Sequence, residues 1–307
     1  MMREVRIMSE APLQTESLKT RVAVLAGDIK LSHTVFAMPW AILATFLAAS
    51  PRLPALGQIG LIVACMVIAR TGAMAANRLL DARLDSLNPR TARRAIPSGK
   101  LSSRFVALTI AACGFALIVT TSGFGIFYNN WIPLIASVPV YAFICAYPLM
   151  KRYTRWCHYY LGMALALAPV CAWAAIAGTL SIEPLLMFVA VLLWTAGFDI
   201  IYACQDFETD RATGVYSVPA RMGIPRALWM ARCSHLACVG ALVALGLVSI
   251  PLHVIYFVGV GIASLLLFYE HTLVRADDLS KVNLAFFTLN GIIALTLGTL
   301  GIVDILL

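Results

Sequence analysis

The sequence has 307 residues, of which 61% are hydrophobic and only 12% are charged, and its formal net charge is +8. Its mean hydropathy of +0.87 excludes an ordinary water-soluble globular protein and indicates a membrane protein. The positive charge needs no nucleic-acid partner, because basic loops beside apolar segments are typical of a cytoplasmic membrane surface.

The first thirty residues contain several charged side chains and no apolar run before about residue 35. This pattern does not match a cleavable signal peptide. We therefore expect residues 1–30 to be a cytoplasmic, partly mobile tail. Residues 31–307 are expected to form a single transmembrane domain.

Nine apolar stretches follow, each long enough to cross a bilayer about 30 Å thick. Helices are expected, because a segment in lipid must satisfy its own backbone hydrogen bonds, and no stretch shows the alternation of a barrel strand. The predicted fold class is therefore an all-α bundle of nine transmembrane helices. The expected spans are 33–50, 57–80, 104–122, 130–149, 158–179, 184–204, 226–247, 249–270 and 283–305.

The basic residues are distributed unevenly over the loops between these spans. Of the 23 Lys and Arg residues, 21 fall in the tail and the alternate loops that share its side of the membrane. The loops on the other side contain only Arg52, and Arg70 lies within a span. Because positive residues are retained in the cytoplasm, the sequence predicts a multi-pass bacterial inner-membrane protein with a cytoplasmic amino terminus and an external carboxyl terminus.

Two acidic windows, "NRLLDARLD" and "DIIYACQDFETD", lie at the cytoplasmic ends of the second and sixth spans. At about 100° per residue, the polar side chains of each window fall on one face of their helix, whereas Glu208 points the opposite way. Each window closes the second helix of a four-helix run and is followed by a proline turn, which predicts two related halves plus one further helix. The grouped side chains are Asn77, Asp81 and Asp85 in the first window and Asp199, Asp206 and Asp210 in the second.

Two interpretations of these windows are open. The carboxylates could be solvated helix ends with ordinary salt bridges. However, carboxylates grouped on one face repel one another unless a cation lies between them, and neighbouring hydrocarbon adds to the cost. Mg²⁺ fits this arrangement, because it is held by one or two carboxylates while water and substrate phosphates complete its coordination. Two clusters on separate helices would then hold a diphosphate from both sides.

Basic and aromatic side chains near the windows are candidate substrate ligands. Lys151 follows Tyr147 by one helical turn, so both can face the same pocket, and Arg70 is costly within a span unless it meets an acid or an anionic substrate. Aromatic faces can stabilise a carbocation, although in helical bundles they are more often packing residues. The remaining candidates are Arg94 and Arg152 for the diphosphate and Tyr141 and Tyr202 for the cation.

Cysteine and histidine give no signal for a metal site. The eight cysteines are scattered without a C-x-x-C pair, and we interpret them as small hydrophobic residues. The five histidines show no i, i+4 pairing.

The segments "NRLLDARLDSLNPRTARRAIPSG", "YPLMK" and "DIIYACQDFETD" resemble the three signature regions of the UbiA superfamily of intramembrane aromatic prenyltransferases. The resemblance covers nearly the whole chain. It implies Mg²⁺-dependent transfer of a polyprenyl group from a prenyl diphosphate to an aromatic acceptor in quinone biosynthesis, with no obligatory protein partner. The two polar clusters match the magnesium–diphosphate positions, and Tyr147 with Lys151 matches the motif that assists diphosphate ionisation.

The first motif departs from that of many hydroxybenzoate enzymes, which have Asn-Asp where this chain has Asn77 and Arg78, and a proline where it has Ala95. This variant resembles a subgroup labelled as 4-hydroxybenzoate polyprenyltransferases, some of which use a dihydroxynaphthoate acceptor for menaquinone. The expected acceptor is therefore of the 4-hydroxybenzoate type, with dihydroxynaphthoate as the alternative.

Rival functions fit the sequence less well. A cation-coupled transporter would place its charged site near the middle of the membrane on broken helices, whereas these acids collect at one surface. A membrane phosphotransferase acting on nucleotide-linked alcohols would carry an Asp-Gly-x-x-Ala-Arg run, which is missing. A quinone-binding scaffold would have no use for paired carboxylate clusters.

Overall fold

The computed structural model describes residues 17–29 and 36–307, and in this part of the chain all regular secondary structure is helical. A 3₁₀ turn, η2 (Cys204–Asp206), follows α7, and a π-helical segment, η3 (Leu284–Leu289), precedes α12. The helices are α1 (Leu18–Asp28), α2 (Met38–Ala49), α3 (Leu56–Leu87), α4 (Ser103–Tyr128), α5 (Ile132–Met150), α6 (Cys157–Ala177), α7 (Ile182–Ala203), α8 (Phe207–Thr213), α9 (Val218–Met222), α10 (Ile224–Val248), α11 (Val254–Leu273) and α12 (Asn290–Leu306).

Eight helical segments within the described residues are long and apolar enough to cross a membrane. With α2, which is apolar but only 12 residues long, they correspond to the nine predicted spans. The predicted start of the first span falls at residues 33–35, outside the described residues. The all-α bundle is thus confirmed, with α2–α5 and α6–α11 supplying the two halves and α12 the additional helix.

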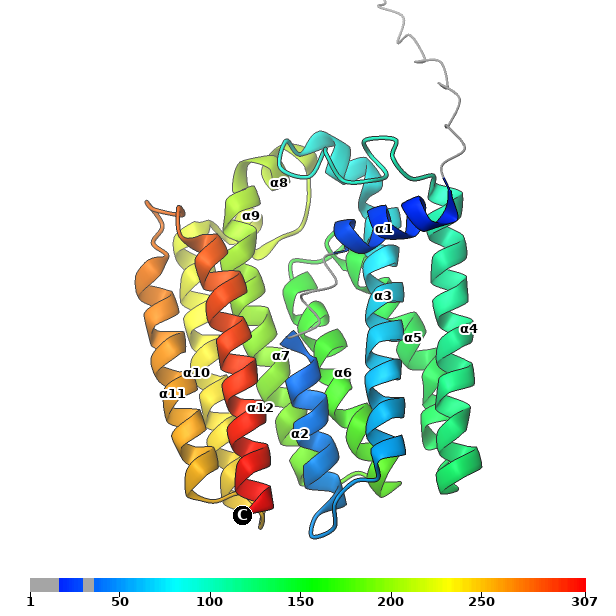
Figure 1. Ribbon diagram of the computed structural model, residues 1–307. Coiled ribbons are helices and arrows are strands. Elements are labelled where there is room, and N and C mark those ends of the chain that lie inside the picture. Colours follow the sequence, from blue (N-terminus) through cyan, green and yellow to red (C-terminus); the bar gives the residue numbers. More distant parts are fainter. Residues whose placement is uncertain (1–16, 30–35) are drawn as a thin grey trace, which may run out of the picture.

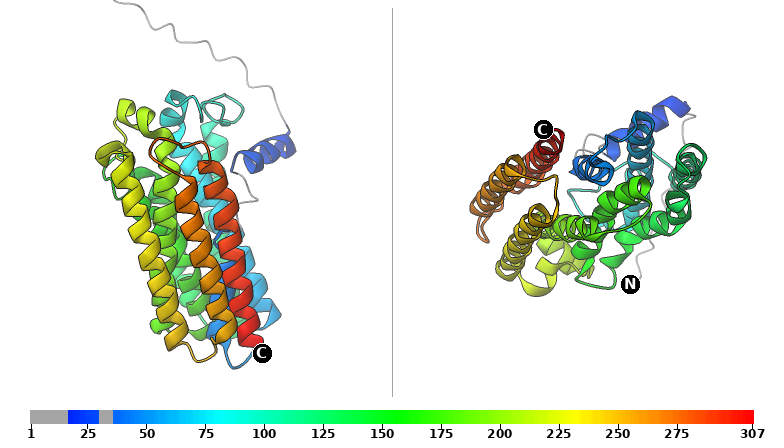
Figure 2. Two further views of the ribbon diagram at one scale, coloured as in Figure 1. Left: turned by 90° about the vertical axis from the view of Figure 1, so that its left-hand side faces the viewer. Right: turned by 90° about the horizontal axis from the view of Figure 1, so that it is seen from below.

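The long helices run roughly side by side, whereas α1 lies across the bundle at the end that also carries α8 and α9 (Figure 1). The carboxyl terminus lies at the opposite end (Figure 1). Viewed along the helices, α4 and α5 lie on one side of the molecule and α11 and α12 on the other (Figure 2). Part of the expected mobile tail therefore has a defined structure: α1 is a helix whose Leu25 side chain is buried.

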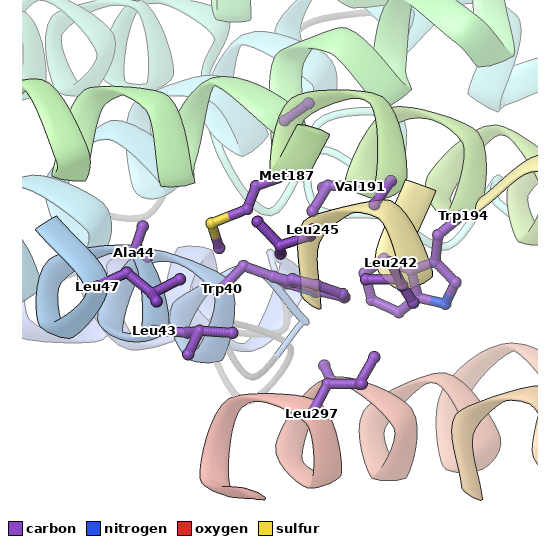
Figure 3. Close-up of a cluster of buried hydrophobic side chains, with 14 of the residues drawn as sticks. Trp40, Leu43, Ala44, Leu47, Met187, Val191, Trp194, Leu242, Leu245 and Leu297 are labelled. Atoms are coloured by element: carbon purple, nitrogen blue, oxygen red, sulfur yellow. The ribbon is translucent and has the colours of Figure 1, made fainter. Parts of the chain in front are cut away.

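The main hydrophobic core joins α2, α7, α10 and α12 (Figure 3). Trp40 of α2 and Trp194 of α7 are both about 1% exposed or less, and their rings lie 5.6 Å apart. Leu242 and Leu297 pack around them from α10 and α12 (Figure 3). This core holds the second half against α2 and fixes the direction of α7, which carries the second acidic window.

Small residues allow a close contact between α6 and α7, as expected where lipid competes for apolar surface. Gly162 of α6 faces the backbone carbonyl of Leu192 in α7, and a Cβ at this position would overlap that oxygen. This contact sets the spacing between two helices that both line the cavity described below.

Replacing Gly162 by Ala is therefore expected to destabilise the protein by about 1–3 kcal/mol, because a backbone oxygen cannot rotate away from the added methyl group. Gly261→Ala in α11 is the matched control, since a Cβ there meets no atom within 4 Å. Thermal unfolding of the detergent-solubilised proteins measures the difference. Equal unfolding midpoints for the two variants would contradict the close contact.

Candidate active site

A cavity of about 1250 Å³ lies between the two halves of the bundle. Its inner part is lined mainly by apolar side chains of α3, α5 and α6, and its other end is lined by charged side chains. Both acidic windows reach this cavity although they are more than 100 residues apart in the chain. The lining residues from the two windows are Asn77, Asp81, Asp85, Asp199, Asp206 and Asp210.

Asp81 is the most buried carboxylate of the first window, with 1% of its surface exposed. Its Oδ2 atom accepts hydrogen bonds from Asn77 Nδ2 and from Lys151 Nζ, each at 2.6 Å. Its Oδ1 atom is buried and has no hydrogen-bond partner among the described residues. Lys151 stands at the end of α5, so this contact joins the first window to the "YPLMK" segment.

Asp85 lies one turn further along α3 and is 5% exposed. Arg94, from the loop after α3, donates to both of its carboxylate oxygens at 2.8 Å. Thr91 of the same loop donates its hydroxyl to the Asp85 carbonyl at 3.1 Å. The loop after α3 is thereby folded back over the first window.

The same loop also reaches the second window, where α7 ends and the chain turns through η2 into α8. Arg90 donates to both carboxylate oxygens of Asp206, at 3.0 and 2.6 Å, and Asn88 donates to Asp206 Oδ1 at 2.9 Å. Burial opposes the charge on Arg90, but the hydrogen bonds and negative charge of Asp206 outweigh it and raise the pKa of Arg90. The two halves are thus bridged across the cavity by charge-assisted hydrogen bonds.

Asp199 is held by His158, a histidine for which the sequence predicts no role. His158 Nδ1 lies 2.7 Å from Asp199 Oδ2, and His158 Nε2 accepts the Val218 backbone N–H at 3.2 Å. Because Nε2 accepts, the proton of the ring lies on Nδ1 and is donated to Asp199. Helical spacing can indicate a pair of metal-binding histidines, but a histidine and an aspartate 41 residues apart leave no pattern in the sequence.

Most of the other predicted cations and phenols lie on the cavity. Arg70, Arg94, Tyr147, Lys151 and Tyr202 line the cavity. Tyr147 donates a long hydrogen bond of 3.8 Å to Met74 Sδ.

Two predicted substrate-binding residues, Tyr141 and Arg152, lie outside the cavity, and we correct both predictions. Tyr141 donates to the Ile110 carbonyl at 2.7 Å and packs against Gly72, because it lies about 120° around α5 from Tyr147. Arg152 follows the end of α5 and donates to the backbone carbonyl of Leu80 on α3. The position of Arg152 next to Lys151 in the sequence therefore did not predict the direction of the Arg152 side chain.

An aromatic group lines the cavity beside Asp206. The Tyr202 ring packs against Phe286 at 4.1 Å, and the Arg90 guanidinium lies 5.3 Å from the Tyr202 centroid on the same site. Phe286 belongs to η3, whose register is held where Asn290 Nδ2 donates to the Ala285 carbonyl at 3.0 Å. Phe286 was missed because a phenylalanine within an apolar span gives no signal of its own.

The fold and the cavity together define a polytopic α-helical membrane protein with two acidic clusters facing one internal, largely apolar cavity. The chain belongs to the UbiA prenyltransferase family, whose model matches residues 37–292. It is therefore a prenyltransferase, as the motifs predicted.

Individual relatives support the same assignment. The chain is 31% identical over 256 residues to 4-hydroxybenzoate octaprenyltransferase from Photobacterium profundum, covering 82% of this chain and 85% of the relative. It is 28% identical over 297 residues to the protein of the same name from Nitrosococcus oceani, covering 93% and 98%. The apo structure of a UbiA homolog from Aeropyrum pernix K1 matches with a TM-score of 0.75 and 28% identity, covering 90% of this chain and 98% of that chain.

A more distant structure has the same fold. A UbiA homolog from Archaeoglobus fulgidus, solved with DMAPP and Mg²⁺ bound, matches with a TM-score of 0.70 and 19% identity. The match covers 94% of this chain and 99% of that one.

Proposed function

We propose that this prenyltransferase carries a polyprenyl group from a prenyl diphosphate to an aromatic acceptor of the 4-hydroxybenzoate type, and that it depends on Mg²⁺. The observation that carries the proposal is the meeting of two acidic clusters and several cations at one end of a long apolar cavity. Relatives named 4-hydroxybenzoate octaprenyltransferase support the choice of acceptor.

The donor atoms at the polar end suit Mg²⁺. Carboxylate and amide oxygens are the hard ligands that this ion prefers, and Asp81 Oδ1 is buried without a hydrogen-bond partner in the described part of the chain. Within the described residues, no three His, Cys, Asp or Glu side chains are close enough to hold a metal by themselves. We therefore infer that diphosphate oxygens complete the coordination, with ligands drawn from the six polar residues of the two windows. When bound, Mg²⁺ neutralises diphosphate charge.

The cations of the site would stabilise the leaving group. Lys151 and Arg94 are each held by an acid of the first window, and Arg90 by Asp206. The allylic C–O bond breaks and the diphosphate departs with the electron pair, leaving an allylic carbocation. A ring carbon of the acceptor, activated by its hydroxyl oxygen, attacks the cation, and loss of the ring proton restores aromaticity. Tyr202 and Phe286 present aromatic faces that can stabilise the cation.

The apolar part of the cavity would hold the prenyl chain near the reacting carbon and exclude water from the cation. Met66, Leu165 and Ile144 line this part from α3, α6 and α5. Arg70 lines the cavity two helical turns before Asn77, where it can bind the acceptor carboxylate or a phosphate.

The distribution of charge supports an orientation with the polar end of the cavity at the cytoplasmic face. The loop after α3, the loop after α5 and α8 all lie at the α1 end, and the carboxyl terminus lies at the other (Figure 1). We accordingly propose an inner-membrane enzyme with residues 31–307 as one catalytic domain. The lipid bilayer is its surrounding medium, and the mechanism requires no nucleic acid or protein partner.

A competition between acceptors tests this proposal. Membranes containing the protein are given one short prenyl diphosphate, Mg²⁺, and equal amounts of 4-hydroxybenzoate and dihydroxynaphthoate, and the product is identified by mass. We expect prenylated hydroxybenzoate, and no product after EDTA treatment until Mg²⁺ is restored. If prenylated naphthoate is the only product, the proposed acceptor is wrong but the proposed prenyl transfer is correct. Product formation in EDTA would contradict the proposed Mg²⁺ dependence.

A further inference from the structure

Helix α1 reaches the polar end of the cavity. Gly27 and Asp28, at its carboxyl end, line the cavity together with Arg78 of α3. The side chains of Asp28 and Arg78 are 13% and 7% exposed. Arg78 is the residue at which the first motif departs from the Asn-Asp pattern, so its contacts show what this chain gains from an arginine there.

Arg78 divides its donors between two partners. Its Nε atom and its second terminal nitrogen both donate to the Asp28 backbone carbonyl, at 3.3 and 2.9 Å. The Nε atom also lies 3.2 Å from Asp28 Oδ2, which makes an ion pair without a hydrogen bond. The remaining terminal nitrogen donates to Asn77 Oδ1 at 2.8 Å. The planar guanidinium therefore connects the end of α1 to the neighbouring residue on α3, which a single ammonium donor could not do in the same geometry.

These contacts determine which way the Asn77 amide faces. With its oxygen held by Arg78, its nitrogen is directed at Asp81 Oδ2, 2.6 Å away. The reversed amide would place an NH₂ group against the guanidinium and an oxygen against the carboxylate, so both contacts would become repulsive. The Asp28 backbone carbonyl and the side chains of Arg78, Asn77 and Asp81 thus form one hydrogen-bonded chain from α1 to the first acidic window, and the Asp28 carboxylate adds an ion pair to it.

The charge balance explains why Asp28 matters. Arg94 is a nearby cation that repels Arg78, and Asp28, which forms the ion pair, offsets more of this repulsion than Asp85 does. A buried arginine that loses its acid is costly, and the guanidinium would move to find another partner. Asp85 of the first window is the other acid that attracts Arg78, so a guanidinium released by Asp28 would change the arrangement of that window.

We propose that Asp28 and Arg78 are positioning residues: by fastening α1 to α3, they hold the Asn77 amide toward Asp81 and so preset the first window for the metal-bound diphosphate. This inference rests on the proposed function for the identity of the ligand. It assigns to α1 a role in the site, and it explains the arginine that follows Asn77 in this chain.

The first measurement needs no turnover. The detergent-solubilised protein is titrated with Mg²⁺ in the presence of inorganic pyrophosphate, and the concentration that gives half of the maximal thermal stabilisation is determined. Arg78→Met is expected to raise this concentration about tenfold, which corresponds to the loss of roughly one charge-assisted hydrogen bond. Asp28→Ala keeps the backbone carbonyl but removes the ion pair, so it should raise the concentration by a smaller factor of about three to ten. Because both residues act through one chain, the double variant should be no worse than Arg78→Met alone. Asp277→Asn, an exposed acid in the loop before η3, is the control and should leave the midpoint unchanged.

A second measurement separates positioning from simple docking of α1. Limited trypsin digestion at Lys19 and Arg21 reports whether α1 is held in place. Arg78→Lys keeps a charge for Asp28 but lacks the fork that reaches Asn77, so we expect wild-type protection from trypsin together with a raised Mg²⁺ midpoint. Arg78→Met should lose both.

Unchanged Mg²⁺ midpoints in Asp28→Ala and Arg78→Met, or additive effects in the double variant, would overturn the inference. If the wild-type protein binds Mg²⁺ with pyrophosphate but forms no prenylated product, the proposed function fails. The inference about Asn77 is then still decided by the Mg²⁺ midpoints of the variants. If the wild-type protein shows no Mg²⁺-dependent stabilisation by pyrophosphate, the inference fails whatever the activity.

Discussion

Prenyl transfer is expected to fall by about a hundredfold or more when Asp81 or Asp206 is replaced by Asn, which keeps the shape but removes the charge. Asp81 is the buried acid held by Lys151, and Asp206 is the acid held by Arg90 from the opposite half. If both clusters bind the metal-bound diphosphate, either change weakens the site from one side. Initial rates in membranes with equal amounts of protein measure the effect.

Glu208→Gln is the matched control, because Glu208 carries the same charge on α8 but is exposed and does not line the cavity. Its rate should stay within about a factor of three of the wild-type rate, as for an exposed surface charge. A loss in Asp81→Asn that is accompanied by wild-type thermal stability assigns the effect to the site rather than to folding. Undiminished rates in both aspartate variants would reject these carboxylates as part of the machinery.

Most of the architecture could be predicted because a chain that crosses a lipid bilayer has few possible secondary structures. Apolar stretches of sufficient length must be helices, and the basic loops assign alternate helix ends to one side. Asp81 and Asp206 therefore had to lie at the same end of the bundle, and the structure places both on one cavity. Helix α2 is the exception in length: its described part has only 12 residues.

The partners within the site could not be predicted in the same way. The pairs Arg90–Asp206 and His158–Asp199 depend on how the two halves pack, and they join residues 116 and 41 positions apart. Periodicity describes one helix at a time and says nothing about such contacts. Tyr141 shows the same limit, since its aromatic ring made it a candidate for stabilising the cation although the side chain faces α4.

The aromatic side chains beside Asp206 illustrate a further limit of prediction from sequence. Phe286 reaches Tyr202 from a π-helical segment, where the extra residue per turn changes which side chains face the cavity. That segment is held by Asn290, which also accepts the indole N–H of Trp194 at 2.7 Å and donates to buried Glu270 at 3.1 Å. This polar network within the core sets the register of the π-helical segment. The apolar residues around it do not indicate the altered helical register.

Lys151→Met is the second change expected to have a large effect, because it removes a cation that faces the cavity next to Asp81. We expect kcat to fall by about 10²–10³-fold, in line with the loss of one electrostatic stabiliser of a developing anion. The backbone should keep its place, since the Lys151 carbonyl accepts the Tyr216 N–H at 2.7 Å independently of the side chain. Steady-state kinetics with varied prenyl diphosphate separate kcat from KM.

Arg152→Met offers a close comparison, because Arg152 is the next residue along the chain and the change also removes one positive charge. Its guanidinium is bound to the Leu80 carbonyl outside the cavity, so we expect activity within about threefold of wild type. A general loss of positive charge at this end of the bundle would lower both rates alike. A large loss in Lys151→Met alone would mean that the direction of the side chain, and not the charge of the loop, determines how the diphosphate leaves, whereas equal losses would contradict the cavity assignment of Lys151.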